Sequence, residues 1–284
     1  MNIFNTIKHL QEHIENRKIE KKKIGFVPTM GALHNGHLSL VSAAGKENDI
    51  VVVSIFVNPT QFNKQDDLKN YPRNISSDIK ILENSTCDIV FIPEENEIYP
   101  DTGSMAKKYN FGKIVEIMEG KHRPGHFDGV ATVVGRLFNI VKPNNAYFGQ
   151  KDFQQLALIK ELVNRHLTDL RINIHGCPIV REKDGLAMSS RNVRLNVDER
   201  KSAALISKTL FEAKKHFARY PVKILKEKIT TEINADKNLK LEYIEIVTDT
   251  GLDEIKQWDV KQKMVACIAV QVGNVRLIDN VYIN

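Results

Sequence analysis

Two histidines three residues apart, His34 and His37, flank a glycine where an apolar stretch gives way to a predicted helix. Residues 23–27 predict a strand, Pro28 ends it and Gly31 turns the chain. A strand, a glycine turn and a helix N-terminus together predict open backbone amides and the positive end of a helix dipole, and both favour a phosphate chain. At positions i and i+3 the imidazoles are expected on one helical face, where each can donate a hydrogen bond to a phosphate oxygen.

The histidine pair has two other interpretations. It could be half of a metal site, although no third ligand follows at the usual spacing. It could also be an ordinary surface or cap pair, which is what most His-x-x-His sequences are. The chemistry of the pair therefore depends on polar residues elsewhere in the chain.

Neutral amides follow the second predicted strand. Asn58 and Gln61 lie in the run Asn-Pro-Thr-Gln-Phe-Asn, and such amides can orient hydroxyls and a carboxylate without adding charge. The alternative is a simple turn closed by asparagine and proline.

Cations and hydroxyls follow later predicted strands. Gly149 would let the backbone approach a ligand, and Lys151 is a point cation for phosphate next to a helix start, although a capped helix with an incidental lysine is the alternative. Residues 183–192 hold two serines beside Arg191 on a glycine turn, which is a plausible triphosphate clamp that could close as a lid. The basic loop 120–127 could provide a mobile guanidinium gate through Arg123.

Strands and helices alternate through the first two thirds of the chain. Strands are predicted near residues 23–27, 49–57, 88–93, 146–149 and 172–179, and helices near 3–16, 36–46, 76–84, 130–141 and 152–167. Gly45 is expected to end the second of these helices, and Ser76, Ser77 and Asp78 are expected to cap the third. Alternation at this spacing predicts an α/β fold with a doubly wound, Rossmann-like parallel sheet, whose ligands gather beyond the carboxyl ends of the strands. The loops just described all occupy such positions.

The pattern changes near residue 180. Two helices, about 197–217 and 222–234, precede three alternating segments at 241–247, 264–270 and 275–281. This predicts a second, smaller α+β domain. We therefore divide the chain into a Rossmann-like domain at 1–179 and a smaller C-terminal α+β lid domain at 180–284.

Composition limits the classes of function. The chain has 284 residues and a net charge of +6, but the basic residues are scattered apart from a run at 17–23, which argues against a nucleic-acid surface. Its three cysteines, about ninety residues apart, do not predict a disulfide framework or a zinc cluster. No apolar run reaches the roughly 18 residues of a membrane span, and no signal-peptide pattern opens the chain. A cytoplasmic protein without a nucleic-acid or membrane partner is expected.

The chemical residues together resemble a known family. His34-Asn35-Gly36-His37 is similar to the HIGH signature, and Met188-Ser189-Ser190-Arg191 to the KMSKS loop, of the nucleotidyltransferase superfamily that includes class I aminoacyl-tRNA synthetases. Six blocks, at residues 28–37, 56–62, 71–73, 123–130, 151–155 and 188–192, resemble the pantothenate synthetase (pantoate–β-alanine ligase) family in order and spacing. The C-terminal hundred residues resemble it only in general pattern.

The resemblance implies a two-step reaction. Pantoate would attack the α-phosphate of ATP to give pantoyl adenylate, and the amine of β-alanine would then displace AMP. The implied catalytic residues are His37, with His34 and Lys151. The implied ATP-binding residues are Met30, Gly31, Ala32, Leu33, His34, Asn35, Gly36, His37, Gly149, Gln150, Lys151, Asp152, Val180, Met188, Ser189, Ser190 and Arg191.

The remaining ligands and partners follow from the same resemblance. Gln61 and Gln155 would bind pantoate, and Gln61 would also lie near β-alanine. Mg²⁺ would be held chiefly by phosphate oxygens and water, because the motifs offer no carboxylate cage, and Asp78 is the candidate for an outer-shell partner. A homodimer is expected from the family. The chain departs from the family at Gln150, where many members have glutamate.

Two rival functions make different demands on the sequence. A cytidylyltransferase, or another adenylyl-transferring enzyme of the same fold, would keep the histidine pair but would not need Gln61 and Gln155. An RNA-binding module would need clustered arginines and exposed aromatic residues. The sequence shows no such clusters.

Overall fold

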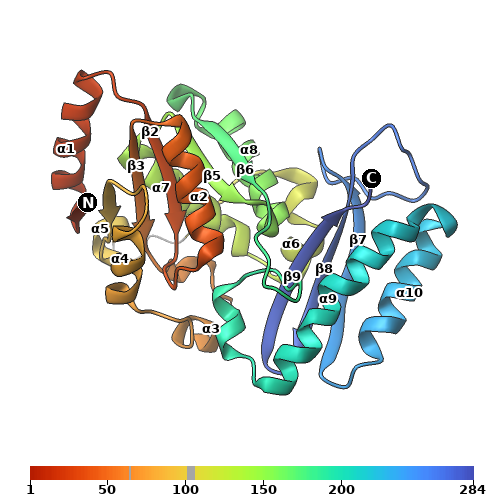
Figure 1. Cartoon of the computed structure of the whole chain (residues 1–284). Coiled ribbons are helices and arrows are strands. Elements are labelled where there is room, and N and C mark those ends of the chain that lie inside the picture. The colour runs from red at the N-terminus through yellow and green to blue at the C-terminus, as the bar shows by residue number, and fades with distance from the viewer. Residues whose placement is uncertain (64, 101–105) are drawn as a thin grey trace. The chain divides into compact units, whose positions relative to one another are not determined.

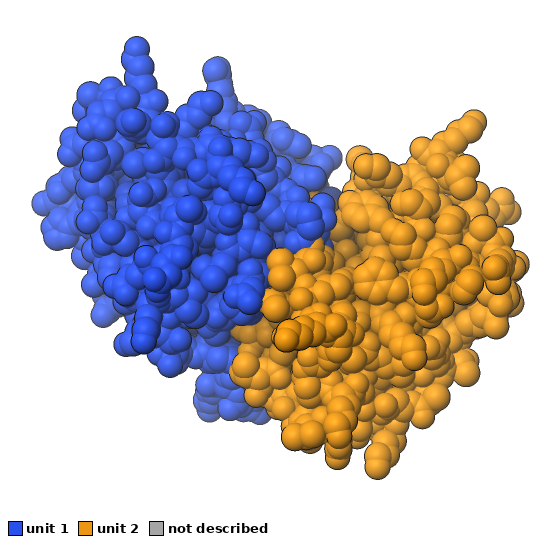
Figure 2. All heavy atoms as spheres, viewed as in Figure 1, with its two compact units in different colours: residues 1–150, 158–178 blue, residues 151–157, 179–284 orange. Residues whose placement is uncertain are grey.

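The computed structural model describes residues 1–63, 65–100 and 106–284 and divides into two compact units. The first comprises Met1–Gln150 and Leu158–Pro178, and the second Lys151–Ala157 and Ile179–Asn284 (Figure 2). The sequence-based boundary at residue 180 assigned residues 151–157 to the first domain, whereas their contacts group them with the second unit.

The first unit is built on a parallel sheet of six strands. Its strands are β1 (Asn2–Phe4), β2 (Ile24–Thr29), β3 (Ile50–Ile55), β4 (Ile89–Phe91), β5 (Asn145–Gly149) and β6 (Asn173–Cys177), in the spatial order β1-β4-β3-β2-β5-β6. The chain runs outward from β2 through β3 and β4 on one side, and through β5 and β6 on the other. The order therefore reverses between β2 and β5, which is the switch point where such sheets bind ligands.

Helices, some of them of only one turn, connect these strands (Figure 1). They are α1 (Ile7–Ile19), α2 (Asn35–Glu47), α3 (Gln65–Lys69), α4 (Ile75–Glu83), α5 (Glu95–Ile98), α6 (Met118–His122), α7 (His126–Val141) and α8 (Phe153–His166), with short 3₁₀ turns at Pro59–Gln61 and Gln150–Asp152. Helix α8 begins in the second unit and ends in the first.

Both faces of the sheet are apolar, as the nearly continuous hydrophobic strands predict. On one face Val27 and Val53 pack with Leu40 of α2 and Leu82 of α4. On the other face, the ring of Phe26 meets that of Phe138 of α7 at 6.3 Å between centroids. Successive side chains of β2 thus pack on opposite faces of the sheet. This fixes the register of the strand that leads into the histidine pair.

Three local predictions were wrong. Residues 3 and 4 belong to strand β1, which pairs with β4, and not to the first helix; three residues are too few to show a strand period. Gly45 lies inside α2 and does not end it, and its missing Cβ accommodates Thr86, whose Oγ1 would lie 2.5 Å from that atom. The helix after residue 74 is capped by Asn74 instead of the predicted serines and aspartate at 76–78.

The second unit is the predicted smaller α+β domain. Strands β7 (Leu239–Thr248), β8 (Met264–Val272) and β9 (Val275–Tyr282) form an antiparallel sheet. Helices α9 (Val197–His216) and α10 (Val222–Asn234) lie against it and share its apolar core, which includes Ile206, Leu225 and Ile268 (Figure 1). The fold class predicted from the sequence is confirmed for both units.

Candidate active site

The turn between β2 and α2 is held by side chains. Gly31 and Ala32 both have positive φ angles, 77° and 49°, and this left-handed backbone is costly for alanine. The amide of Gly31 donates to Thr29 Oγ1 at 3.2 Å. The amides of Ala32 and Leu33 donate to the two carboxylate oxygens of Asp78, at 2.9 and 2.7 Å. Asp78 is 2% exposed, so a buried carboxylate from α4 fixes the strained turn.

A reciprocal cap then starts helix α2. His34 is the N-cap residue and precedes the helix, so the prediction that both histidines lie on a helical face is wrong for His34. The amide of Gly36 donates to His34 Nδ1 at 3.1 Å, and the amide of His34 donates to His37 Nδ1 at 3.3 Å. The two imidazole rings are adjacent, 4.1 Å between centroids.

The cap determines how the imidazoles can act. Because Nδ1 of each ring accepts a backbone hydrogen bond, each neutral ring carries its proton on Nε2. His34 and His37 can therefore each donate from Nε2 to an anion. The predicted open amides are wrong for five positions, because side chains accept their hydrogen bonds: Gly31, Ala32, Leu33, His34 and Gly36. The imidazole Nε2 groups, more than these five amides, are therefore the groups of this motif that are placed to donate to an anion.

Gln61 is fixed beside the β2–α2 turn. It is 8% exposed, its Oε1 accepts from Asn58 Nδ2 at 3.2 Å, and its Nε2 contacts Met30 Sδ at 3.0 Å. Asn58 is fixed in turn by the hydroxyl of Tyr99, which donates to Asn58 Oδ1 at 2.7 Å, and by the carbonyl of Gly129. Two of the predicted site residues, Met30 and Gln61, are therefore in direct contact within the first unit.

The start of α7 supports the same loop. His126 Nδ1 donates to the backbone carbonyl of Gln61 at 2.8 Å, and Arg123 Nη1 lies 3.1 Å from His126 Nε2. Arg123 also reaches the Gln61 carbonyl at 3.4 Å and Glu119 at 3.6 Å. Arg123 was predicted as a mobile gate, and in the structure its guanidinium is tied into the support of Gln61.

In the second unit, residues 180–188 form a hairpin. Arg181 bridges Ala187, the amide of Met188 donates to the carbonyl of Val180 at 3.0 Å, and Gly185 turns the chain at φ 93°. Immediately afterwards, the 3₁₀ helix Ser190–Arg194 is capped by Ser189, whose Oγ accepts from the amide of Arg191 at 3.2 Å. The predicted clamp residues thus stand at the end of a closed hairpin.

Lys151 belongs to the same unit as this hairpin. It lies in the 3₁₀ turn before α8, with its Nζ 3.8 Å from Asp152 Oδ1. Gln155 follows on the first turns of α8. The predicted site residues therefore divide between the units. Met30 to His37, Gln61, Asp78, Gly149 and Gln150 lie in the first; Lys151, Asp152, Gln155, Val180 and Met188 to Arg191 lie in the second.

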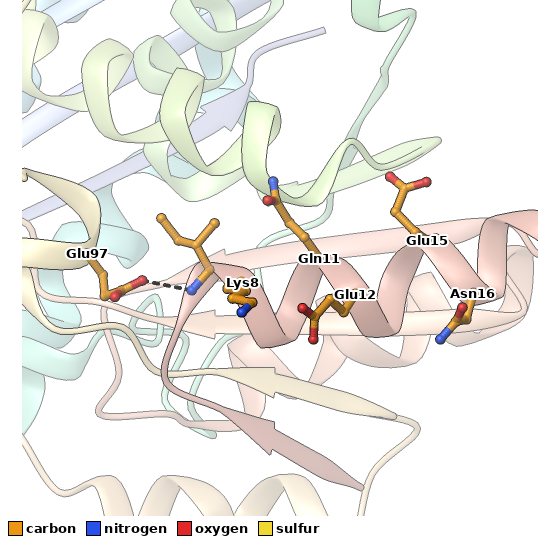
Figure 3. A pocket seen from close by; sticks show the side chains of 7 residues that line it. Lys8, Gln11, Glu12, Glu15, Asn16 and Glu97 are labelled. Carbon is orange, nitrogen blue, oxygen red and sulfur yellow. Dashed lines mark hydrogen bonds between the residues drawn. The ribbon is translucent and has the colours of Figure 1, made fainter.

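A shallow surface groove on α1 is separate from these residues. It is lined by Ile7, Lys8, Gln11, Glu12, Glu15, Asn16 and Glu97 (Figure 3). Glu97 accepts a hydrogen bond from the amide of Ile7 at 2.8 Å and so satisfies a backbone donor at the start of α1. None of the predicted site residues lines this groove.

Sequence reasoning missed two supporting side chains, Tyr99 and His126. His126 lies within one of the blocks that carry the family resemblance, and this block was the only signal for it. Tyr99 follows a short helix in an interval without regular periodicity, and its bond to Asn58 spans 41 residues. No local pattern could have predicted that bond.

The described residues contain no group of three or more His, Cys, Asp or Glu side chains that could hold a metal ion. Both oxygens of Asp78 already accept backbone amides, so this carboxylate does not fit as a direct ligand. A magnesium ion bound mainly by phosphate oxygens and water needs no such group. Within the same described ranges, none of the helices is long and apolar enough to cross a membrane.

Comparisons with known proteins agree on one family. The sequence profile described as pantoate-beta-alanine ligase matches residues 2–282. Pantothenate synthetases of Porphyromonas gingivalis and Phocaeicola vulgatus are 47% and 48% identical to the chain over 281 residues, which is 99% of the chain and 99% of each relative.

Solved structures give the same result. Pantothenate synthetase from Thermus thermophilus superposes with a TM-score of 0.91 at 36% identity, and covers 100% of this chain and 99% of its own. A pantoate-beta-alanine ligase from Francisella tularensis, complexed with beta-gamma ATP and beta-alanine, superposes with a TM-score of 0.83 at 41% identity, over 100% of this chain and 98% of its own.

Proposed function

Because this chain belongs to the pantoate-beta-alanine ligase family, we propose that it condenses pantoate with β-alanine in an ATP-dependent reaction through a pantoyl adenylate. A carboxylate oxygen of pantoate forms a bond to the α-phosphorus, and the bond from that phosphorus to the bridging oxygen of pyrophosphate breaks. The β-alanine nitrogen then bonds to the acyl carbon, AMP leaves, and the amine loses a proton. The Francisella structure, which holds beta-gamma ATP and beta-alanine, supports two of the three substrates.

The observation that carries the proposal is the capped histidine pair at the switch point of the sheet. In-line attack at phosphorus needs positioning and charge stabilisation more than covalent help from the protein. His34 and His37, protonated on Nε2 by the cap, can donate to oxygens whose charge grows as the phosphate bond breaks. We assign His37 the main catalytic role and His34 a supporting one.

The acid substrate is proposed to bind through two glutamines. Gln61 is fixed by Asn58 and Met30, so its amide is preorganised to orient the hydroxyls or carboxylate of pantoate and, in the second step, β-alanine. Gln155, on the first turns of α8, is proposed as the second pantoate ligand. Neutral amides can bind both hydroxyls and a carboxylate without adding a formal charge.

The second unit is proposed to supply the phosphate ligands. Lys151 provides a point charge, and Ser189, Ser190 and Arg191 provide hydroxyl and guanidinium donors. Gly149, Gln150, Asp152, Val180 and Met188 complete the proposed nucleotide contacts, together with the backbone from Met30 to Gly36. Mg²⁺ is proposed to accompany ATP, where it would neutralise phosphate charge.

The decisive experiment is exchange of labelled pyrophosphate into ATP. We expect exchange that requires pantoate and does not require β-alanine, because adenylation is complete before the amine enters. A protein that exchanges with CTP in place of ATP, or that shows no exchange with pantoate present, would not catalyse the proposed reaction. The first of these outcomes would instead support a cytidylyltransferase of the same fold.

The catalytic role proposed for His37 can be separated by mutation from its structural role in the helix cap. In His37→Asn, the side-chain oxygen can still accept the His34 amide, but the Nε2 donor is lost. We expect adenylation in a single turnover to slow by roughly 10²–10³, with little change in stability. His37→Leu is the matched variant, because it loses the Nε2 donor and the cap acceptor together, and the lost cap should lower stability by about 0.5–2 kcal/mol. An unchanged single-turnover rate in His37→Asn would remove this imidazole from the mechanism.

The compartment and the assembly are further parts of the proposal. We propose a cytoplasmic homodimer, as the family resemblance implies. Cys87, Cys177 and Cys267 all lie among the described residues, are buried and form no disulfide with one another, which suits a reducing compartment. Light scattering after size-exclusion chromatography tests the dimer, since a monomer mass at micromolar protein would contradict it.

A further inference from the structure

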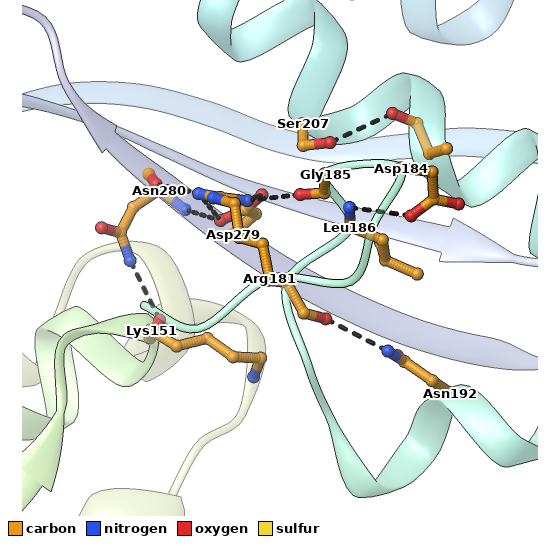
Figure 4. Close-up of polar contacts among 11 residues, drawn as sticks. Lys151, Arg181, Asp184, Gly185, Leu186, Asn192, Ser207, Asp279 and Asn280 are labelled. Atoms are coloured by element: carbon orange, nitrogen blue, oxygen red, sulfur yellow. Dashed lines mark hydrogen bonds and ion pairs between the residues drawn. The ribbon is translucent and has the colours of Figure 1, made fainter. Parts of the chain in front are cut away.

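A polar cluster on β9 joins the two phosphate-binding segments of the second unit. Asp279 is 3% exposed and accepts both arms of the Arg181 guanidinium, at 2.6 and 2.9 Å (Figure 4). The same guanidinium donates to the carbonyls of Gly185 at 3.0 Å and Asn280 at 3.2 Å. Its carbon lies 4.9 Å from the centroid of the Phe211 ring. Arg181 is therefore held by four acceptors and one aromatic face.

The neighbouring residue on β9 holds the other segment. Asn280 Nδ2 donates to the backbone carbonyl of Lys151 at 3.0 Å (Figure 4). The ring of Phe153 lies against that of Tyr282 at 6.2 Å between centroids. Two consecutive residues of one strand thus bind the hairpin of residues 180–188 through Arg181 and the start of α8 through Lys151.

Each contact fixes the backbone close to a proposed ATP ligand. Arg181 lies at the base of the hairpin and hydrogen-bonds its turn through the carbonyl of Gly185. The hairpin leads directly to Ser189 and Arg191. The bond to the Lys151 carbonyl fixes the main chain from which the ammonium projects. Misplacement of a charged donor by about 1 Å can lower a rate by about 10², so anchors of this kind determine how well the two segments act together.

We propose that Arg181, Asp279 and Asn280 are positioning residues that set Lys151 and the 189–191 segment at one fixed spacing for the nucleotide phosphates. This inference rests on the proposed ATP-dependent function. It assigns a role to the β9 strand, in the part of the chain whose sequence matched the family only in general pattern. Burial raises the pKa of the Asp279 carboxyl, and the hydrogen bonds and positive charge of Arg181 oppose that rise.

The two anchors predict a selective pattern of coupling. Asn280→Ala removes the bond to the Lys151 carbonyl, and we expect the Kd for ATP to rise about tenfold. In a Lys151→Ala background the same change should raise it less than twofold, because the ammonium that it positions is gone. In an Arg191→Ala background the tenfold effect should persist.

Arg181→Lys should show the opposite pattern. A lysine cannot serve all four acceptors, so the Kd for ATP is expected to rise about tenfold in the wild type. The effect should persist with Lys151→Ala and nearly vanish with Arg191→Ala. Arg276→Gln is the matched control, since Arg276 lies on the same strand but pairs with Glu242 on the exposed side. It should leave ATP affinity unchanged.

Calorimetric titration of the full-length protein with ATP measures each Kd, and thermal unfolding checks that the fold is intact. Asn280→Leu, which has the same number and branching of side-chain heavy atoms, replaces Asn280→Ala if the smaller variant unfolds. The positioning role would be overturned if Asn280→Ala, or Arg181→Lys, changed the Kd for ATP equally in the Lys151→Ala and Arg191→Ala backgrounds. Failure of the wild-type protein to bind ATP would overturn it as well. Selective coupling without pantoate-dependent exchange would instead support the positioning role and refute the proposed reaction.

Discussion

Asp78→Asn tests whether one buried carboxylate fixes the turn that carries the histidines. In the wild type its two oxygens accept the amides of Ala32 and Leu33, at 2.9 and 2.7 Å. The asparagine amide has a single oxygen, so its NH₂ group must face one of these donors. One buried N–H then loses its acceptor, which costs about 1–3 kcal/mol. Ala32 at φ 49° would also be released from a strained conformation that only its surroundings maintain.

We therefore expect the free energy of unfolding of Asp78→Asn to fall by about 1–3 kcal/mol at neutral pH. Pantoate-dependent exchange should fall more than this loss of stability explains, because the turn positions His34 and His37. Urea unfolding and exchange under conditions where both proteins are fully folded measure the two effects. Asp88→Asn is the control, because exposed Asp88 accepts a single amide, from Val51 at 2.8 Å, and an asparagine oxygen can replace it.

The difference in stability between the wild type and Asp78→Asn should depend on pH in one direction. Burial raises the pKa of the Asp78 carboxyl, and the two backbone hydrogen bonds oppose the rise without cancelling it. The folded protein then binds a proton more readily than the unfolded chain, so this site stabilises the fold most below the ordinary aspartate pKa and loses that contribution as pH rises through the raised pKa. The stability difference between wild type and Asp78→Asn should widen on acidification. If it narrows, the amides outweigh burial and the reasoning fails.

Further predictions concern packing and accessibility. Gly129→Ala should lower the free energy of unfolding by about 1–3 kcal/mol, because its Cβ would lie 2.5 Å from the Thr60 carbonyl oxygen. A Cβ on Gly135, in the same helix, would meet its nearest atom at 3.5 Å. Gly135→Ala should therefore leave the free energy of unfolding in urea unchanged or raise it by up to about 1 kcal/mol. Equal losses of stability in the two variants would contradict this. Burial raises the pKa of the Cys87 thiol to about 12, so alkylation followed by mass spectrometry should label it only in denaturant; rapid labelling of the native protein would refute this.

The order of the elements and the motif blocks were predictable because both depend on residues that are close together in the sequence. Continuous β-branched runs predict buried parallel strands, and the helix and strand periods of residues 197–281 predicted the second unit within a few residues. Strand β1 was missed because three residues carry no period, and its place is fixed by pairing with β4, far along the chain.

The supports of the site were not predictable for a related reason. The bonds from Asp78 to Ala32 and from Asn280 to the Lys151 carbonyl join residues 46 and 129 positions apart. In each bond one partner is a main-chain N–H or C=O group, which nearly every residue carries, so the residue type does not reveal it. Side-chain chemistry can be found by inspection of residue types, whereas the second partner of such a bond becomes visible only when the chain is folded.

The cap on helix α2 changes how mutations of the histidine motif must be interpreted. His37 contributes Nδ1 to the fold and, in the proposed mechanism, Nε2 to chemistry. His34 does the same, because its Nδ1 accepts the amide of Gly36 and its Nε2 is left for chemistry in the proposed mechanism. An alanine at either position removes both functions together, and protonation of either Nδ1 would break the cap while adding a positive charge. Hence a loss of activity in an alanine variant, or on acidification, cannot by itself be assigned to catalysis; only variants that keep one nitrogen's function and remove the other's can separate the two.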